Sequence, residues 1–154
     1  MATSTLIQYL ETELKDGFGA TVAVGTSSMN RRQVETFIAA AAVAAGDLVS
    51  LDAGQAADGD KAIKVKPGDS GQTKLSCPVG VALAAAGIGE KVEVCVRGVC
   101  EAKLLACTEG DVLTHTATAG SMDTIAAATD PQVAIALETA AAPGTFTVYV
   151  RGAF

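Results

Sequence analysis

Few residues in this chain could carry chemistry, and they are scattered. A Ser-His-Asp arrangement would have to use His115, the one histidine, which lies among threonines and is better interpreted as a solvated loop residue. The four cysteines, Cys77, Cys95, Cys100 and Cys107, form no CxxC pair and lack the close spacing of a zinc site. We therefore predict free thiols, with a disulfide between Cys95 and Cys100 as the minor alternative, and no catalytic or metal centre.

A cluster of acids is the feature best suited to a cation. Asp58, Asp60 and Asp69 fall in one glycine-rich stretch, and calcium prefers carboxylate oxygens. Their spacing does not match an EF-hand loop, so solvated acids in turns are the favoured interpretation. The chain also lacks a phosphate-binding loop, an HExxH motif and a GxSxG motif. The sequence predicts a protein that is not an enzyme and has no cofactor.

Composition narrows the possible partners. The chain has 154 residues, of which 49% are hydrophobic and 18% charged, so it is expected to fold. Its net charge of −6 does not suit the neutralisation of phosphates, and we expect no nucleic-acid partner. No apolar run approaches the roughly 18 residues of a membrane span. The start of the chain lacks the pattern of a secretion signal, so synthesis in the cytoplasm is expected.

An internal duplication is the most informative feature of the sequence. Three segments recur further along the chain with matching apolar positions, and two of the three also share a glycine. The pairs are 46–49 with 110–113, 78–83 with 132–137 and 92–99 with 146–153. The first pair is 64 residues apart and the other two are 54 residues apart. The first copy therefore carries about ten extra residues, which fall within 52–77 and are predicted to form a longer surface loop.

Alternating apolar and polar residues indicate strands with one buried face. The alternation is clearest at 91–97 and 145–151, and a lysine-rich segment at 61–66 follows the same pattern. Gly98 follows the first of these runs and is interpreted as a bulge that lets the strand bend. We predict a mainly β fold: a small β-barrel or sandwich of two related units, about 34–105 and 106–154.

The first part of the chain is expected to lie outside this body. Ser4 or Thr5 can cap a short helix, and an extended arm follows it, so residues 1–32 form a separate region from the body at 33–154. The helix has an apolar face of Leu6, Ile7, Leu10 and Leu14. The alanine-rich segment 34–45 is ambiguous, because propensity favours a helix while its surroundings favour a strand followed by a loop.

Several short sequence motifs, taken in order, resemble a known family. They are VETFI at 34–38, AGDLV at 45–49, PVGVAL at 78–83, GEKVEV at 89–94 and RGV at 97–99. Across residues 34–105 this order is similar to the capsid decoration (cement) proteins of tailed bacteriophages. The second copy repeats it more loosely, as far as Arg151.

The resemblance implies a function as well as a fold. It implies a β-barrel-like body that assembles as a homotrimer on the exterior of the virion. There it would bind the major capsid protein and stabilise the expanded shell against the pressure of the DNA. The N-terminal region departs from shorter members of the family, and we expect it to contact the capsid or a neighbouring copy. The candidate contact residues are Leu6, Ile7, Leu10, Leu14, Arg31 and Arg32.

A second function remains open at this point. A small β-barrel could instead bind a ligand, with calcium held by Asp58, Asp60 and Asp69. A carbohydrate site usually needs aromatic platforms, and the chain has no tryptophan and two tyrosines, Tyr9 and Tyr149. The structural role is therefore the favoured hypothesis.

Overall fold

The computed structural model describes residues 32–69, 77–126 and 131–151. The predicted N-terminal helix with its apolar face, and the arm as far as Arg31, lie outside these ranges. The elements are β1 (Arg32–Ala39), β2 (Leu48–Leu51), α2 (Asp58–Ile63), β3 (Lys64–Pro67), β4 (Pro78–Ala82), β5 (Lys91–Leu104), β6 (Val112–His115), β7 (Met122–Thr124), β8 (Ala134–Ala136) and β9 (Gly144–Val150). The described chain is therefore mainly β, as predicted.

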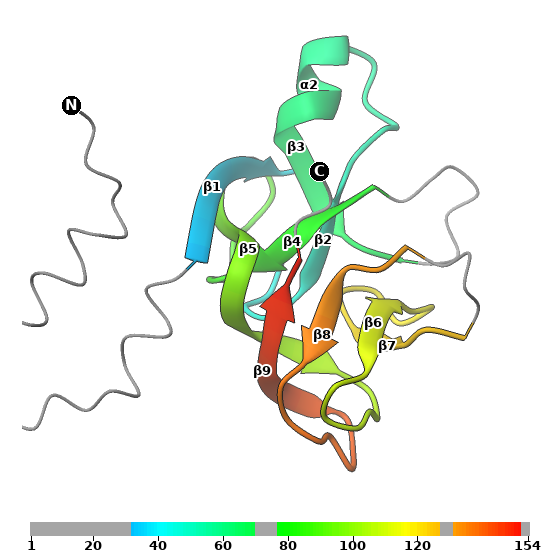
Figure 1. The fold of residues 1–154 in the computed structure, drawn as a ribbon. Coiled ribbons are helices and arrows are strands. Elements are labelled where there is room, and N and C mark those ends of the chain that lie inside the picture. Colours follow the sequence, from blue (N-terminus) through cyan, green and yellow to red (C-terminus); the bar gives the residue numbers. More distant parts are fainter. Residues whose placement is uncertain (1–31, 70–76, 127–130, 152–154) are drawn as a thin grey trace, which may run out of the picture.

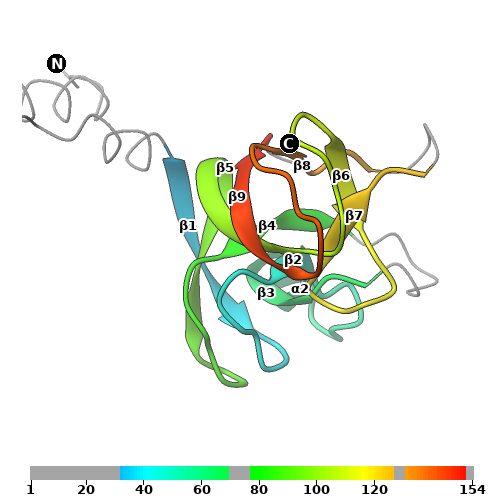
Figure 2. The same cartoon turned by 90° about the horizontal axis from the view of Figure 1, so that it is seen from below.

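One nine-stranded sheet closes on itself twice. Its strand order is β1-β3-β2-β4-β5-β7-β6-β8-β9, and further pairings join β1 to β5 and β5 to β9. The first ring contains β1, β3, β2, β4 and the start of β5, and the second contains the rest of β5 with β7, β6, β8 and β9. Figure 2 looks into the second ring, with β2 and β4 of the first ring lying behind it. The long strand β5 therefore belongs to both rings (Figure 1).

A bulge and a glycine allow β5 to turn from one ring into the other. The register with β1 skips one residue, because Gln33 lies opposite Arg97 and Val34 lies opposite Cys95. Gly98 follows with a φ of 110°, a conformation that residues with a Cβ rarely adopt. The sequence predicted the bend at Gly98. It did not predict that the strand continues to Leu104, where it pairs with β7 and β9.

The two rings repeat the same pairings. In each ring one pair of strands is parallel, β1 with β3 and β5 with β7, and the other four pairs are antiparallel. Gly46 and Gly110 both have a positive φ, and the carboxylates of Asp47 and Asp111 each accept the backbone N–H of the residue three positions earlier. We propose that residues 34–105 and 106–154 are two copies of one unit, with the end of the first copy serving both rings.

Two hydrophobic clusters fill the rings, and the second extends beyond its own ring. The first cluster contains Ala39, Val43, Val49, Val65, Val79, Ala82, Ala86, Val92, Val94 and Val96. The second includes Leu104, Leu113, Met122, Val148 and Val150 of the second ring. It also includes Leu48, Val81 and Cys95, which come from β2, β4 and the first part of β5 and are 0% exposed. The outer face of the first ring therefore covers one end of the second ring.

In two segments, the structure can be compared with the helix or strand that the sequence favours. The alanine-rich segment is β1 followed by a loop in which Val43 bridges to Ala86, so sheet pairing prevails over helix propensity there. The predicted strand at 61–66 is wrong in its first half. Residues 58–63 form α2, in which Asp58 pairs with Lys61 at 2.7 Å, and Asp60 pairs with Lys64, the residue after the helix, at 2.9 Å. Acids at its start and lysine at its end also suit the helix dipole.

Leu48 is predicted to be a main contact between the rings. We expect Leu48→Ala to lower the free energy of unfolding by about 2 to 5 kcal/mol, because it opens a cavity where the rings meet. Val112 occupies the corresponding place in the second copy but is partly exposed, so Val112→Ala should cost less than about 1 kcal/mol. Urea unfolding of both variants provides the measurement, and equal costs would contradict the assignment.

Candidate protein-contact site between the two rings

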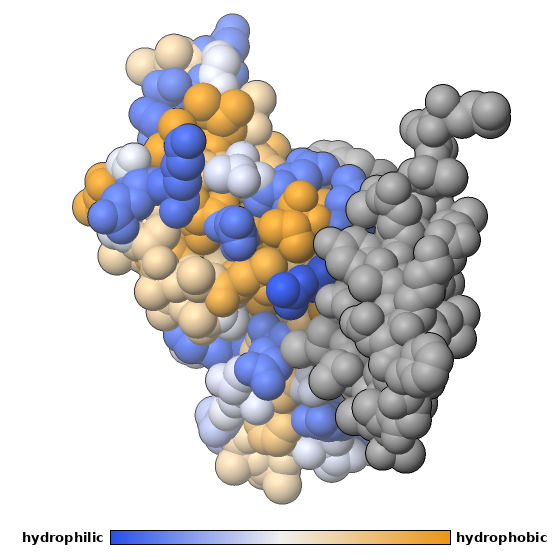
Figure 3. Space-filling view, turned by 90° about the vertical axis from the view of Figure 1, so that its left-hand side faces the viewer, coloured by the Kyte–Doolittle hydropathy of each residue, from blue (hydrophilic) through white to orange (hydrophobic). Residues whose placement is uncertain are grey.

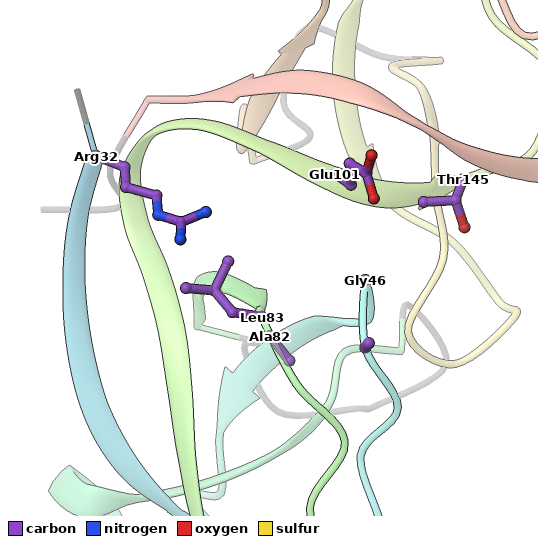
Figure 4. Close-up of a pocket in the computed structure, with 7 residues that line it drawn as sticks. Arg32, Gly46, Ala82, Leu83, Glu101 and Thr145 are labelled. Atoms are coloured by element: carbon purple, nitrogen blue, oxygen red, sulfur yellow. The ribbon is translucent and has the colours of Figure 1, made fainter. Parts of the chain in front are cut away.

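A groove of about 330 Å³ lies where β5 turns between the rings (Figure 4). Its lining combines charged, polar and apolar groups from both copies of the unit. The lining residues are Arg32, Ala45, Gly46, Ala82, Leu83, Glu101 and Thr145. We call this feature the inter-ring groove.

Opposite charges flank the inter-ring groove. Arg32 begins β1 and Glu101 lies in the second half of β5, and both residues are exposed. Figure 4 shows the Arg32 side chain extending towards Leu83, with Glu101 further along β5 on the side of Thr145. Leu83 packs against the second hydrophobic cluster and provides an apolar floor. The groove can thus offer ionic and apolar contacts to a segment of another protein.

An ion pair between the rings fixes one wall of the groove. Lys103 Nζ lies 2.7 Å from Asp47 Oδ1, and the Asp47 side chain is only 9% exposed. The backbone N–H of Lys103 also donates to the carbonyl oxygen of Gly46 at 2.9 Å. Gly120 passes so close that a Cβ there would lie 2.6 Å from Asp47 Cγ. These contacts hold the first copy's Gly-Asp turn against the second ring.

The predicted contact residues are only partly accounted for in the structure. Arg32 lies in the inter-ring groove, whereas Leu6, Ile7, Leu10, Leu14 and Arg31 fall outside the described residues. Sequence reasoning missed Leu83 and Glu101. No sequence signal joins them to Arg32, because only the bend of β5 brings the three together.

His115 and the cysteines, the other candidates for a catalytic role, lie in surroundings that do not favour catalysis. His115 ends β6 and is half-buried, with Nδ1 3.4 Å from Thr114 Oγ1, so its interpretation as a loop residue was wrong. All four cysteines are free. A hydrogen bond with Cys95, together with burial, raises the pKa of the Cys100 thiol well above its usual range. That thiol is therefore neutral at physiological pH and poorly suited to act as a nucleophile.

The predicted acidic cluster does not form a cation site in the described chain. Asp58 and Asp60 pair with lysines of their own segment, and Asp69 follows β3. Within residues 32–69, 77–126 and 131–151, no three potential metal ligands come together. No helix described there has the length and apolarity needed to cross a bilayer.

Asp52 is an acid that the sequence did not single out. It follows β2 and is buried, and its carboxylate accepts hydrogen bonds from Gln55 and Gly54 and lies 3.0 Å from Lys66 Nζ. Burial alone would raise the pKa of Asp52, but the hydrogen bonds from Gln55 and Lys66 outweigh it and hold the pKa below its ordinary value. Asp52 therefore joins the loop before α2 to β3.

Comparison with known proteins gives one family. A family model described as phage cement protein matches residues 29–152, which include both rings. A search of curated protein sequences finds no significant match.

Among solved structures, the fold resembles the head fiber gp8.5 N base of bacteriophage phi29. The two sequences are 20% identical, and the TM-score is 0.50. The alignment covers 77% of this chain and 92% of that chain. The similarity therefore extends over nearly the whole of the phi29 domain and concerns the fold.

The contribution of the Asp47–Lys103 ion pair to stability can be measured by comparison with Asp111, the corresponding residue of the second copy. We expect Asp47→Ala to lower the free energy of unfolding by about 2 kcal/mol, since it removes a partner from Lys103 and a backbone N–H. Asp111→Ala removes the same turn hydrogen bond and an exposed hydrogen bond from Thr124 Oγ1, but no ion pair, and should cost about 1 kcal/mol. Chemical denaturation of both variants measures the difference, which should disappear in a Lys103→Met background.

The lowered pKa of Asp52 predicts a pH dependence. A carboxyl with a lower pKa in the folded state adds stability above its unfolded pKa, and this contribution is lost as the pH falls below about 4. We therefore expect the free energy of unfolding to fall more steeply with acidification in the wild type than in Asp52→Asn. Urea titrations at several pH values between about 3 and 6 check this. Parallel curves would show that Asp52 makes no such contribution.

Proposed function

The chain belongs to the phage cement protein family and is a structural protein of a phage virion, and on that premise we propose that it binds the outer surface of a tailed-phage capsid. Bound there, it stabilises the expanded shell against the pressure of the packaged DNA. The major capsid protein is the proposed partner, and the role is not enzymatic. The observation that carries this proposal is the family match over both rings.

The inter-ring groove is the proposed contact for a segment of the capsid protein. Arg32 and Glu101 can pair with opposite charges on that segment, and Leu83 can contact an apolar side chain between them. Residues 1–31 lead into β1 at Arg32, and we propose that they add contacts to the capsid through Leu6, Ile7 and their apolar neighbours.

The small side chains of the first hydrophobic cluster also favour a capsid-binding role. The first cluster contains only valine and alanine among its fully buried members. Side chains of this size bury little apolar area, and each contributes about 25 cal/mol per Å² removed from water. Binding of the folded form to a capsid adds stability by mass action. Attachment to the shell would therefore stabilise both partners.

Co-sedimentation with capsids of the same phage tests the proposal. We expect the purified full-length protein to bind expanded, undecorated capsids saturably and to bind unexpanded procapsids weakly, because the role requires the expanded shell. Bound capsids should also resist heating better than bare ones. Lack of binding to either form would refute the proposal.

Variants then locate the contact. Arg32→Glu should weaken binding to expanded capsids at least about tenfold, since a lost ionic contact at an interface costs more than about 1 kcal/mol. Lys61→Glu makes the same change of charge on α2, away from the groove, and should bind normally. Deletion of residues 1–30 should also lower the affinity. If the two charge variants bound equally well, the groove would not be the contact.

A further inference from the structure

The contact between the two rings shows how the outer face of one unit can be covered. Leu48 lies opposite Val81, and Val81 lies opposite Cys95, across β2, β4 and β5. These three residues are 0% exposed, because the second ring covers them and they belong to the second hydrophobic cluster. The internal contact is therefore a template for what would cover the equivalent face of the second unit.

The second unit carries the equivalent face without a ring to cover it. Val112, Ile135 and Tyr149 occupy the corresponding positions, and Ile135 lies opposite both of the other two. All three are partly exposed, and Leu137, which follows β8, is 40% exposed. We call Val112, Ile135, Leu137 and Tyr149 the second-ring face. Its apolar side chains are accessible to a partner.

In the first unit, one glycine of the second ring is inserted where two strands separate. Gly68, just after β3, donates its N–H to the Leu48 carbonyl oxygen of β2 at 2.8 Å, but the reverse hydrogen bond is replaced. Gly120 accepts the Leu48 N–H at 2.7 Å and donates its own N–H to the Gly68 carbonyl oxygen at 2.9 Å. The inserted residue has to be glycine, since a Cβ on Gly120 would lie 2.6 Å from Asp47 Cγ.

The second unit has the same opening between its strands. Val112 and Ile125 correspond to Leu48 and Gly68, and Ile125 donates its N–H to the Val112 carbonyl oxygen at 3.0 Å. Among the residues that the structure describes, none pairs with the Val112 N–H or with the Ile125 carbonyl oxygen. A donor and an acceptor thus lie opposite each other, in the positions that bind Gly120 in the first unit. They can bind the backbone of one inserted residue.

A carboxylate borders the opening in both units. In the internal contact, Lys103 Nζ lies 2.7 Å from Asp47 Oδ1. Asp111 holds the corresponding place in the second unit, where the Thr108 N–H and Thr124 Oγ1 donate to its Oδ2. No lysine or arginine of the described chain forms an ion pair with Asp111. A partner that inserts a residue here would therefore gain from a basic side chain.

We propose that the second-ring face binds a segment of the major capsid protein that inserts a glycine between Val112 and Ile125 and places a lysine or arginine against Asp111. Apolar side chains of the same segment cover Ile135 and Leu137. This inference rests on the proposed function, because the capsid protein is the partner. It adds a contact that shares no residue with the inter-ring groove.

A second copy of this chain does not supply the required groups. The strand pairings place Ile63 at the first-ring position equivalent to Gly120, and Ile38 at the position equivalent to Lys103. Figure 3 views the side that carries β1 and shows apolar residues below the projecting part that holds α2. The first ring therefore offers neither the glycine nor the basic side chain that the internal contact uses, and a different protein is the better occupant.

A charge placed in the second-ring face tests the contact by co-sedimentation with expanded capsids. Leu137→Asp in the full-length protein should weaken binding at least about tenfold, because it puts a carboxylate into an apolar contact. Ile88→Asp is the matched control and should bind normally, because Ile88 is 76% exposed and lies between β4 and β5, outside the face. Thermal melting checks that each variant is folded, and Leu137→Ser serves as a milder substitute.

A conservative variant tests the charge of Asp111. Asp111→Asn keeps an acceptor for the Thr108 N–H but removes the negative charge. It should lower the affinity for expanded capsids about threefold to tenfold at low salt and make binding less sensitive to salt, since one ionic contact is lost. Glu93→Gln removes the same charge from an exposed position on β5 in the first ring and should change neither quantity.

Hydrogen exchange reports directly on the inserted residue. In the free protein, the Val112 N–H should exchange faster than the Leu48 N–H, which Gly120 already binds. On expanded capsids, exchange at Val112 should slow at least about tenfold while exchange at Leu48 stays unchanged. Mass spectrometry of peptic fragments measures both segments.

Other results would overturn the inference, and each has a distinct cause. Equal capsid binding by wild type and Leu137→Asp would overturn it and leave the proposed function standing. Failure of the wild type to bind capsids would refute the proposed function and this contact with it. A wild-type oligomer that Leu137→Asp converts into monomers would place a second copy on the face. Protection of Val112 in the free protein that deletion of residues 1–30 removes would place that segment there.

Discussion

The fold depends on one strand that serves two rings. β5 contributes its first half to one closed set of strands and its second half to another, so neither ring is complete without it. The strand can do this because a residue is skipped in its register with β1 and because Gly98 adopts a positive φ. A straight β5 would leave both rings open and would separate the two clusters. The bend also creates the inter-ring groove, whose walls come from segments far apart in the sequence.

The bend places the rings in unequal surroundings, although their pairings are the same. The first ring turns the row of Leu48, Val81 and Cys95 towards the second ring and buries it. An ion pair between Asp47 and Lys103 then fixes the contact. Both units can keep the same fold in these different surroundings, because each Gly-Asp turn is stabilised by its own aspartate, whether or not a neighbouring ring covers the turn. The body thus has two different ends.

Sequence reasoning recovered what depends on local pattern. Alternation and recurring Gly-Asp turns indicated the strands, and Gly98 indicated the bend. Sequence reasoning failed where long-range contacts or pairs of side chains determine the structure. α2 forms where a strand was expected, because Asp58 and Asp60 pair with nearby lysines. The groove could not be predicted, since Arg32 and Glu101 approach each other only after β5 bends. Asp52 shows no pattern in the sequence, and its role appears only through its hydrogen bonds.

The arrangement suggests why association suits such a protein. A unit with a core of small side chains gains limited stability from its own interior, so the burial of an outer row contributes a larger share. The first unit obtains that burial from the second, whereas the second unit has a partly exposed row with the same chemistry. Further burial has to come from outside the described body, and a capsid is the proposed partner. The proposed duplication therefore buries one apolar row and leaves the corresponding row of the second unit partly exposed.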